Sequence, residues 1–171
     1  MKKIATIIML VAAMIVGTLS DTQAATKKKS TGSSFNMKSL VNKLYANKSE
    51  PVWTATHVKT MMKELGFKYQ GSYTTTILDD YDERIEVDVL KFTKSGVSAE
   101  VYLGNKFVFK FSNSSNAGAF VSASKSAYGS ALKKRDSSYL YMKNYYYWHL
   151  NQNGSVVTIE GGESLDGGQM Y

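Results

Sequence analysis

Residues 84–111 read RIEVDVLKFTKSGVSAEVYLGNKFVFKF, and apolar and polar side chains alternate in three consecutive runs of this stretch. A period of two is typical of strands that bury one face of a sheet and expose the other. Short segments with turn residues, at 94–96 and 104–105, separate the runs. The stretch therefore predicts three antiparallel strands that follow one another as a meander.

A fourth strand is expected directly upstream. Residues 67–77 also alternate, with Phe67, Tyr69, Tyr73 and Ile77 on one side of the extended chain. The meander therefore begins soon after residue 66 and has four strands, with one face in contact with solvent.

Before Gly66 the apolar residues recur with a period of 3.6 instead of two. Residues 36–47 and 54–66 each carry one apolar stripe, which is typical of an amphipathic helix. Asn36 can cap the start of the first helix, and Gly66 can end the second. We therefore expect two helices in front of the meander.

Downstream of the meander, residues 115–134 predict a third helix, because small and apolar side chains recur at helical spacing. Three more strands are expected at 138–142, 145–150 and 155–161. The predicted order is ααββββαβββ, an α+β domain of two layers with the helices packed on an antiparallel sheet. A helix followed by strands occurs twice, which suggests two related halves, although the residues themselves show no repeat.

The aromatic stretch at 139–150, YLYMKNYYYWHL, carries the candidate site. With a turn at residues 143–144, alternation puts Trp148 on the face that continues apolar into the last strand, so we expect Trp148 in the core. The opposite face is expected to carry six candidate binding residues: Leu140, Met142, Tyr145, Tyr147, His149 and Glu160.

Two interpretations of these exposed aromatic residues remain open. Cross-strand aromatic pairs can stabilise a sheet without any further role. Alternatively, the rings form a stacking surface with a polar rim, suited to a glycan, a peptide or a protein partner.

The N-terminus has the pattern of a signal peptide. Lys2 and Lys3 precede an apolar run at 4–19, and small residues lead to a cleavage site after Ala24. A transmembrane anchor is the alternative, because about 16 apolar residues approach the length of a spanning helix. Asp21 and the polar segment that follow favour the signal peptide.

We therefore expect an exported bacterial protein, periplasmic or secreted. The chain contains no cysteine, so burial rather than disulfides must stabilise it. The expected organisation is a signal peptide at 1–24, a flexible basic tail at 25–34, one α+β domain at 35–162 and a frayed tail at 163–171.

The charge of the chain gives little indication of a nucleic-acid partner. The formal net charge is +7, but Lys2, Lys3 and the tail residues Lys27, Lys28 and Lys29 contribute five of the positive charges. The tail is either a solvated tether or a weak contact to an anionic surface. We expect no nucleic-acid binding by the weakly basic remainder.

Catalytic motifs are missing from the sequence. It has no GxSxG, HExxH or Walker-type motif, and only His57 and His149 could supply an imidazole base. We expect no cofactor and no metal site. The acidic run at Asp79, Asp80, Asp82 and Glu83 is interpreted as a solvated hairpin tip, because it lacks the glycine and distal glutamate of a calcium loop.

The leading hypothesis is a non-enzymatic binding module that uses the aromatic face of its sheet. The alternative is a small secreted hydrolase, in which two carboxylates among Glu86, Asp88 and Glu100 act as an acid–base pair.

Overall fold

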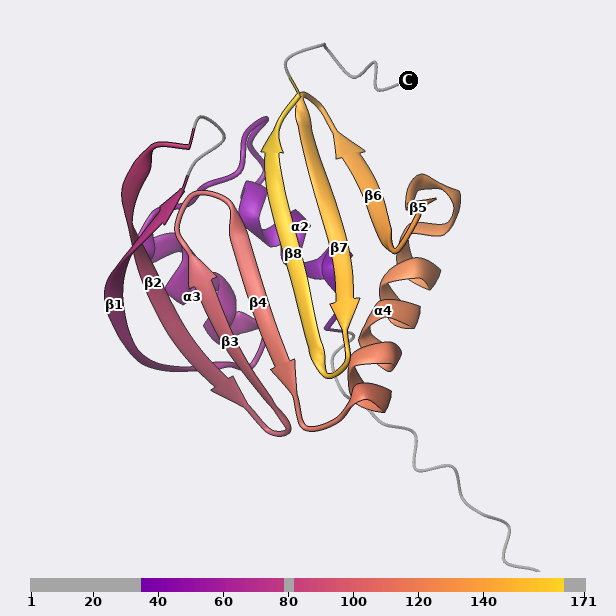
Figure 1. Ribbon diagram of the computed structural model, residues 1–171, viewed down its shortest axis with the longest axis horizontal. Helices are drawn as coiled ribbons and strands as arrows, with labels where there is room; N and C mark the ends of the chain where they lie inside the picture. The colour runs from indigo at the N-terminus through magenta and orange to yellow at the C-terminus, as the bar shows by residue number, and fades with distance from the viewer. Residues whose placement is uncertain (1–34, 79–81, 165–171) are drawn as a thin grey trace, which may run out of the picture. The chain divides into compact units, whose positions relative to one another are not determined.

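The computed structural model describes residues 35–78 and 82–164 of the 171-residue chain. The predicted signal peptide, the predicted basic tail, Asp79, Asp80 and residues 165–171 lie outside the described residues. The described helices and strands (Figure 1) are α2 (Met37–Tyr45), α3 (Ala55–Glu64), β1 (Lys68–Leu78), β2 (Arg84–Lys94), β3 (Val97–Tyr102), β4 (Lys106–Phe111), α4 (Ser114–Tyr128), the 3₁₀ turn η2 (Gly129–Ala131), β5 (Lys133–Arg135), β6 (Ser138–Lys143), β7 (Tyr146–Asn153) and β8 (Val156–Glu163).

An α+β fold with an antiparallel sheet is confirmed. All eight described strands form one sheet in the spatial order β1-β2-β3-β4-β8-β7-β6-β5. It consists of two four-stranded meanders, β1–β4 and β5–β8, which meet where β4 pairs antiparallel with β8. No described helix is long and apolar enough to cross a bilayer.

The predicted order ααββββαβββ was wrong by one strand, because the structure has ααββββαββββ. The missed strand is β5, which the sequence analysis assigned to the end of the third helix. Gly129 leaves helical geometry at φ 57, and the chain is extended by Leu132. The segment Lys133–Arg135 then pairs with β6. Three consecutive cations carry no alternation, so only this pairing defines the strand.

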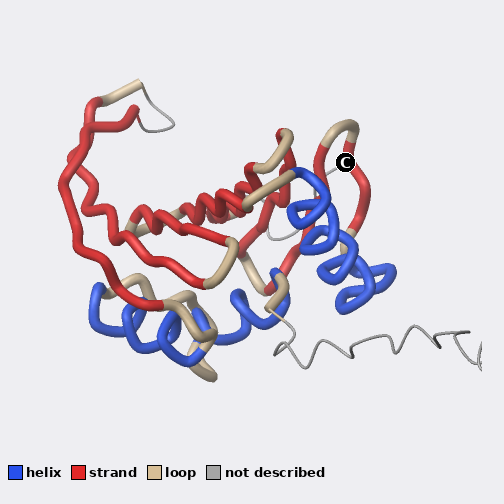
Figure 2. The backbone as a smooth tube through the Cα atoms, turned by 90° about the horizontal axis from the view of Figure 1, so that it is seen from below, coloured by secondary structure: helices blue, strands red, loops and turns tan. Residues whose placement is uncertain are grey.

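The core is one cluster of buried residues from the described helices and the sheet. Met37, Leu40, Val41, Leu44 and Tyr45 are all fully buried, so the predicted stripe of the first helix is confirmed. The same buried cluster contains sheet residues from both meanders and residues of all three helices. Figure 2 shows α2 and α3 on one side of the sheet, while the β1–β2 hairpin bends towards the other side.

Trp148 is the largest fully buried side chain, as the alternation of β7 predicts. Its Nε1–H donates to Tyr45 Oη at 3.3 Å, which satisfies the indole inside the core. Its ring also stacks on Trp53 with 6.1 Å between centroids. Trp148 therefore connects β7 to α2 and to the segment between α2 and α3.

Ser124 is a buried polar residue that joins two helices. Its Oγ accepts a hydrogen bond from the Met37 backbone N–H at 3.0 Å and donates to the Phe120 carbonyl at 2.8 Å. Met37 is the first residue of α2, where the backbone N–H has no partner inside its own helix. Asn36 caps the same helix end through Ser39, as the sequence predicts.

Replacing Trp148 by alanine should lower the free energy of unfolding by about 3–5 kcal/mol, because it empties a large enclosed site. Tyr145→Ala is the control, since that side chain is 68% exposed in a turn. Its loss should be about 0.5 kcal/mol. Urea unfolding followed by far-UV circular dichroism measures both, and similar losses would contradict the assignment of Trp148 to the core.

Ser124→Ala should cost about 1–3 kcal/mol, because the buried Met37 N–H loses its partner. Ser122→Ala, on the exposed side of the same helix, is the matched control and should be near neutral. Thermal or urea unfolding compares the two variants. An equal effect would mean that the α2–α4 hydrogen bond contributes nothing measurable.

Candidate functional site

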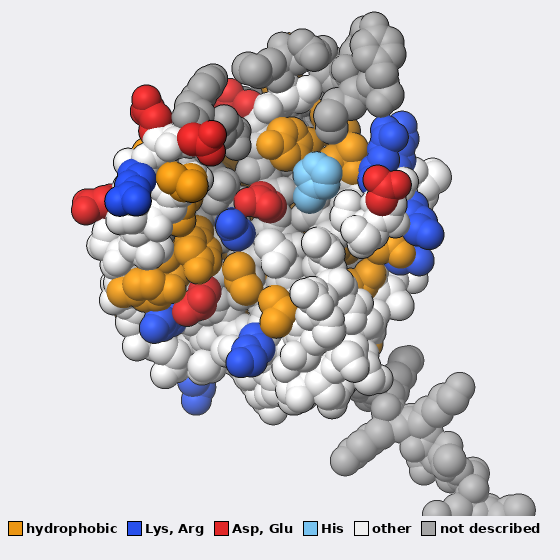
Figure 3. Space-filling model, in the orientation of Figure 1, with side chains coloured by type: hydrophobic (Ala, Val, Ile, Leu, Met, Phe, Trp, Pro, Cys, Tyr) orange, Lys and Arg blue, Asp and Glu red, His pale blue; other side chains and the backbone are white. Residues whose placement is uncertain are grey.

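The side chains that alternate with the core residues of the sheet form its second face, which we call the open face. Figure 3 views this face directly. One row of side chains marks it. The row crosses all eight strands, one residue from each, with every residue opposite the next in register. In spatial order it contains Tyr73, Val89, Tyr102, Lys106, Glu160, His149, Leu140 and Lys133.

The two meanders meet on the open face through an ion pair. Lys106 on β4 lies opposite Glu160 on β8, with 3.2 Å between Nζ and Oε1. The same ammonium lies 5.5 Å from the centre of the Tyr102 ring. Lys106 is therefore held between an aromatic ring of the first meander and a carboxylate of the second.

Tyr73 anchors the β1–β3 part of this face. Partial removal from water, followed by hydrogen bonds to Tyr102 and Glu100, raises the pKa of the Tyr73 hydroxyl to about 12. The Lys91 ammonium lies 4.5 Å from the centre of the Tyr73 ring, a cation–π distance. Polar contacts therefore run from β1 to Lys106 and on to Glu160.

A cleft of about 510 Å³ opens beside Glu160 and His149, the residues of β8 and β7 in this row. The β4–β8 register ends at Lys106 and Glu160, and only the Gly161 N–H still reaches across, to the Asn105 carbonyl at 2.7 Å. The cleft is lined by the following residues: Pro51, Trp53, Gly104, Asn105, Tyr146, Tyr147, Trp148, His149, Glu160, Gly161, Gly162 and Glu163.

The cleft combines aromatic walls with carboxylates. Glu163 Oε1 accepts a hydrogen bond from Tyr146 Oη at 3.0 Å. This contact, together with burial as the larger cause, raises the pKa of Tyr146 to about 12. The rings of Tyr147 and His149 meet edge-on, 5.4 Å apart. The lining contains two glutamates and no lysine or arginine.

Two adjacent glycines of β8 make room for the two neighbouring aromatic residues of β7. A Cβ at Gly161 would lie 2.8 Å from the Trp148 ring on the core face, and one at Gly162 would lie 2.3 Å from Tyr147 Oη on the open face. Ring atoms of Trp148 and Tyr147 therefore occupy the space that side chains at these two positions of β8 would fill.

The structure brings five of the six candidate binding residues to the open face: Leu140, Met142, Tyr147, His149 and Glu160. Leu140 is only 4% exposed, so it supports its neighbours more than it offers a contact surface. That these residues bind a partner stays a prediction.

Tyr145 lies in the turn instead of on the open face. Asn144 takes a left-handed conformation, φ 56, and starts a two-residue turn one position later than expected. Lys143 therefore stays in the strand and pairs with Tyr146. Asparagine tolerates this conformation better than most residues, which explains the shift.

Tyr73 belongs to this face although the sequence pattern did not predict it there. Simple alternation predicts Tyr69 and Tyr73 on one side, but the register shifts between Tyr69 and Gly71. Tyr69 lies opposite Phe92 of the core face, whereas Tyr73 lies opposite Val89 of the open face. A β-bulge adds one residue and so reverses the side on which later residues point.

Glu100 lies on the opposite face of the sheet from the other two carboxylates of the alternative hydrolase. It shares the open face with Lys91, its register partner. Glu86 and Asp88 alternate with Val87 and therefore both point to the other face, where Asp88 accepts a hydrogen bond from Thr74 Oγ1 at 2.8 Å. The two carboxyl groups of an acid–base pair must flank one substrate bond, so Glu100 cannot act with either of them, and neither Glu86 nor Asp88 lines the cleft.

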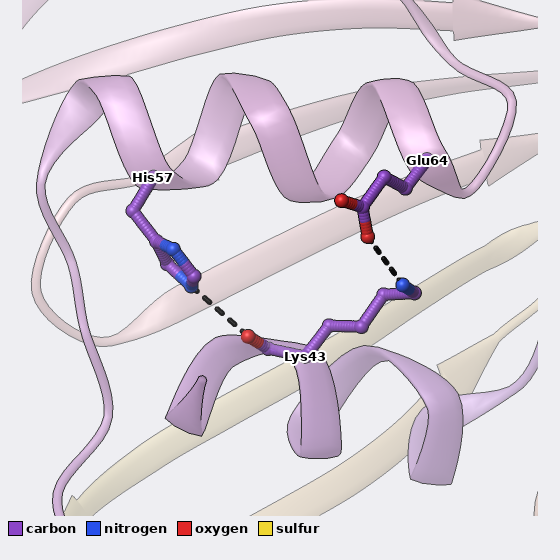
Figure 4. Close-up of polar contacts among 3 residues, drawn as sticks. All are labelled: Lys43, His57 and Glu64. Carbon is purple, nitrogen blue, oxygen red and sulfur yellow. Dashed lines mark hydrogen bonds and ion pairs between the residues drawn. The ribbon is translucent and has the colours of Figure 1, made fainter. Parts of the chain in front are cut away.

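His57 belongs to the helix packing. Its Nε2–H donates to the Lys43 carbonyl at 3.0 Å, and Lys43 forms an ion pair with Glu64, as Figure 4 shows. The Lys43 ammonium lowers the pKa of Glu64 through this hydrogen bond. These contacts hold the end of α2 against α3.

Within residues 35–78 and 82–164, no group of three or more histidine, aspartate or glutamate side chains lies close enough to hold a metal ion. Half of the acidic run, Asp79 and Asp80, falls outside those ranges.

Comparison with known proteins returns no match: no family model, no characterised protein and no solved structure is significantly similar to this chain. The site must therefore be interpreted from its own chemistry.

The paired glycines provide a test of the site geometry. Gly161→Ala should lower stability by about 1–3 kcal/mol, because the enclosed Trp148 ring cannot move away from the added methyl group. Gly162→Ala should cost less than about 1 kcal/mol, because Tyr147 borders the cleft and can rotate outwards. Urea unfolding compares the stabilities, and aromatic NMR spectra report the displacement of Tyr147. Equal losses would contradict this geometry.

Proposed function

We propose that this chain is an exported, non-enzymatic binding module of the bacterial envelope or exterior. Its partner is an extended peptide segment of another protein, held on the open face with a basic side chain in the cleft. The observation that carries the proposal is the charge of the cleft. In a chain with 21 lysines and arginines against 14 acidic residues, the cleft has two glutamates and neither lysine nor arginine in its lining.

The chemistry of the cleft suits an arginine or lysine side chain. A cation over the Tyr147 ring gains a cation–π interaction, which is stronger where water is partly excluded. Glu163 lines the same cleft from the core-face side of β8, opposite Tyr146, and can accept charge-assisted hydrogen bonds from a cation that enters between β8 and the β3–β4 turn. Glu160 already forms an ion pair with Lys106 of β4. Glu163 is therefore the main carboxylate for the basic side chain of the partner.

The wider architecture is part of this proposal. Two layers, with the helices on the side opposite the binding face, would leave the open face free for a partner. Two related halves are supported by the topology, since each meander follows a helix and the fourth strands of both pair with each other. The leader pattern supports export, and Lys27, Lys28 and Lys29 could then contact an anionic surface.

A non-enzymatic function is supported by the positions of the three carboxylates of the hydrolase alternative. Glu100 lies on the opposite face of the sheet from Glu86 and Asp88, and none of the three lines the cleft. For this reason we do not propose the hydrolase.

Selection of random linear peptides on the purified protein tests the proposal. We expect the selected peptides to be enriched in arginine or lysine and to bind with measurable heat in isothermal titration calorimetry. Tyr147→Ala and Glu163→Gln should each raise the dissociation constant by about tenfold or more, which corresponds to about 1.4 kcal/mol. Circular dichroism verifies that both variants remain folded.

Glu86→Gln is the control, because it removes a carboxylate of β2 that does not line the cleft. It should leave binding unchanged. Selected peptides without basic residues, or equal effects of Glu86→Gln and Glu163→Gln, would contradict the proposal. Binding of a chitin oligosaccharide that depends on Tyr147 would assign the cleft to a glycan instead.

A further inference from the structure

The two edges of the sheet differ in charge and length. The β5 edge is three residues long and consists of Lys133, Lys134 and Arg135. The β1 edge is eleven residues long, and its residues 69–78 contain no charged residue and no proline. Short length, lysine and proline are the usual means by which proteins prevent an edge from pairing with another chain. The β5 edge has such protection, and the β1 edge beyond its bulge has none.

Exposed apolar side chains concentrate beside the β1 edge. Among the described residues, five large apolar or aromatic side chains are exposed, and four of them belong to β1 or β2: Tyr69, Tyr73, Leu78 and Ile85. No residue of β1 is buried. The pairing of β1 with β2 is regular from Ser72 to Leu78, after the bulge. Among the described strands β1 pairs only with β2, so an uncharged segment of regular register is available along its outer side.

We propose that a second copy of this chain pairs with the β1 edge in antiparallel orientation, so that the two sheets continue into each other. Such a contact is isologous, since the same strand serves both copies around a two-fold axis. Charge is the reason to expect a second copy of the chain at the β1 edge and not at the β5 edge. In any antiparallel register that overlaps residues 69–78 with themselves, no like charges meet, whereas two copies of the β5 edge would bring six cations together.

One register also pairs the side chains well. When the two-fold axis passes through Thr75, Tyr73 lies beside Ile77 of the second copy, and Ser72 lies beside Leu78. Tyr73 and Ile77 are on the open-face side of β1. Aromatic and β-branched residues directly opposite each other are favourable cross-strand neighbours. The contact uses no residue of the cleft, so it does not depend on the function proposed above.

Sedimentation velocity across a wide range of protein concentrations tests the proposal. We expect a monomer–dimer equilibrium in the purified protein. Thr76→Lys should raise the dimer dissociation constant by about tenfold or more, because it places like charges near the two-fold axis. Within one copy the new lysine lies opposite Glu86, so the monomer fold should be retained.

Thr56→Lys is the matched control, because it adds the same charge on the exposed side of α3. It should leave the dimer intact. Hydrogen exchange supplies a second readout, since backbone amides of residues 72–78 should become more protected as the concentration rises. A protein that stays monomeric overturns the proposal, and so does a dimer that Thr76→Lys and Thr56→Lys affect equally. A monomeric result would leave the edge to a strand of a different protein.

Discussion

The antiparallel pairing of β4 with β8 is the constraint on which the rest of the structure depends. Every other strand pair joins neighbours along the chain, so β4–β8 is the one pairing in the described sheet that closes a long loop. On the core face it places Phe107 opposite Ile159 and Phe109 opposite Val157, all four fully buried. Loop closure costs entropy, and burial of these side chains offsets that cost.

The same pairing determines where the candidate site lies. Because the core face of β4 and β8 is apolar, the alternate residues Lys106 and Glu160 must meet on the open face, where they form an ion pair. The pairing ends at this point, and the cleft begins where β8 continues without β4 beside it. The long-range contact that completes the core therefore also creates the opening next to it.

The two proposed contacts use opposite parts of the sheet. The cleft lies between β8 and the β3–β4 turn, whereas the β1 edge is four strands away in the sheet order. The cleft offers charge and aromatic faces, which select a partner by chemistry. The edge offers an uncharged strand, which is suited to a symmetric contact because no like charges meet when the same strand serves both copies.

The sequence by itself determined which residues alternate and which side of each strand is apolar. The stripe of α2, the burial of Trp148 and the common face of Tyr147, His149 and Glu160 all follow from periods of 3.6 and two. These periods are local properties of the backbone geometry, so neighbouring residues suffice to reveal them.

The tertiary structure decided what no local pattern could. The bulge before Gly71 moved Tyr73 to the open face, since one added residue changes the side of all that follow. The turn at Asn144 includes Tyr145 and so removed that residue from the strand. Strand β5 exists because β6 pairs with it, not because its three cations favour an extended chain. The cleft arises from residues of β7, β8 and two loops that are distant in sequence, and only the β4–β8 contact brings them together.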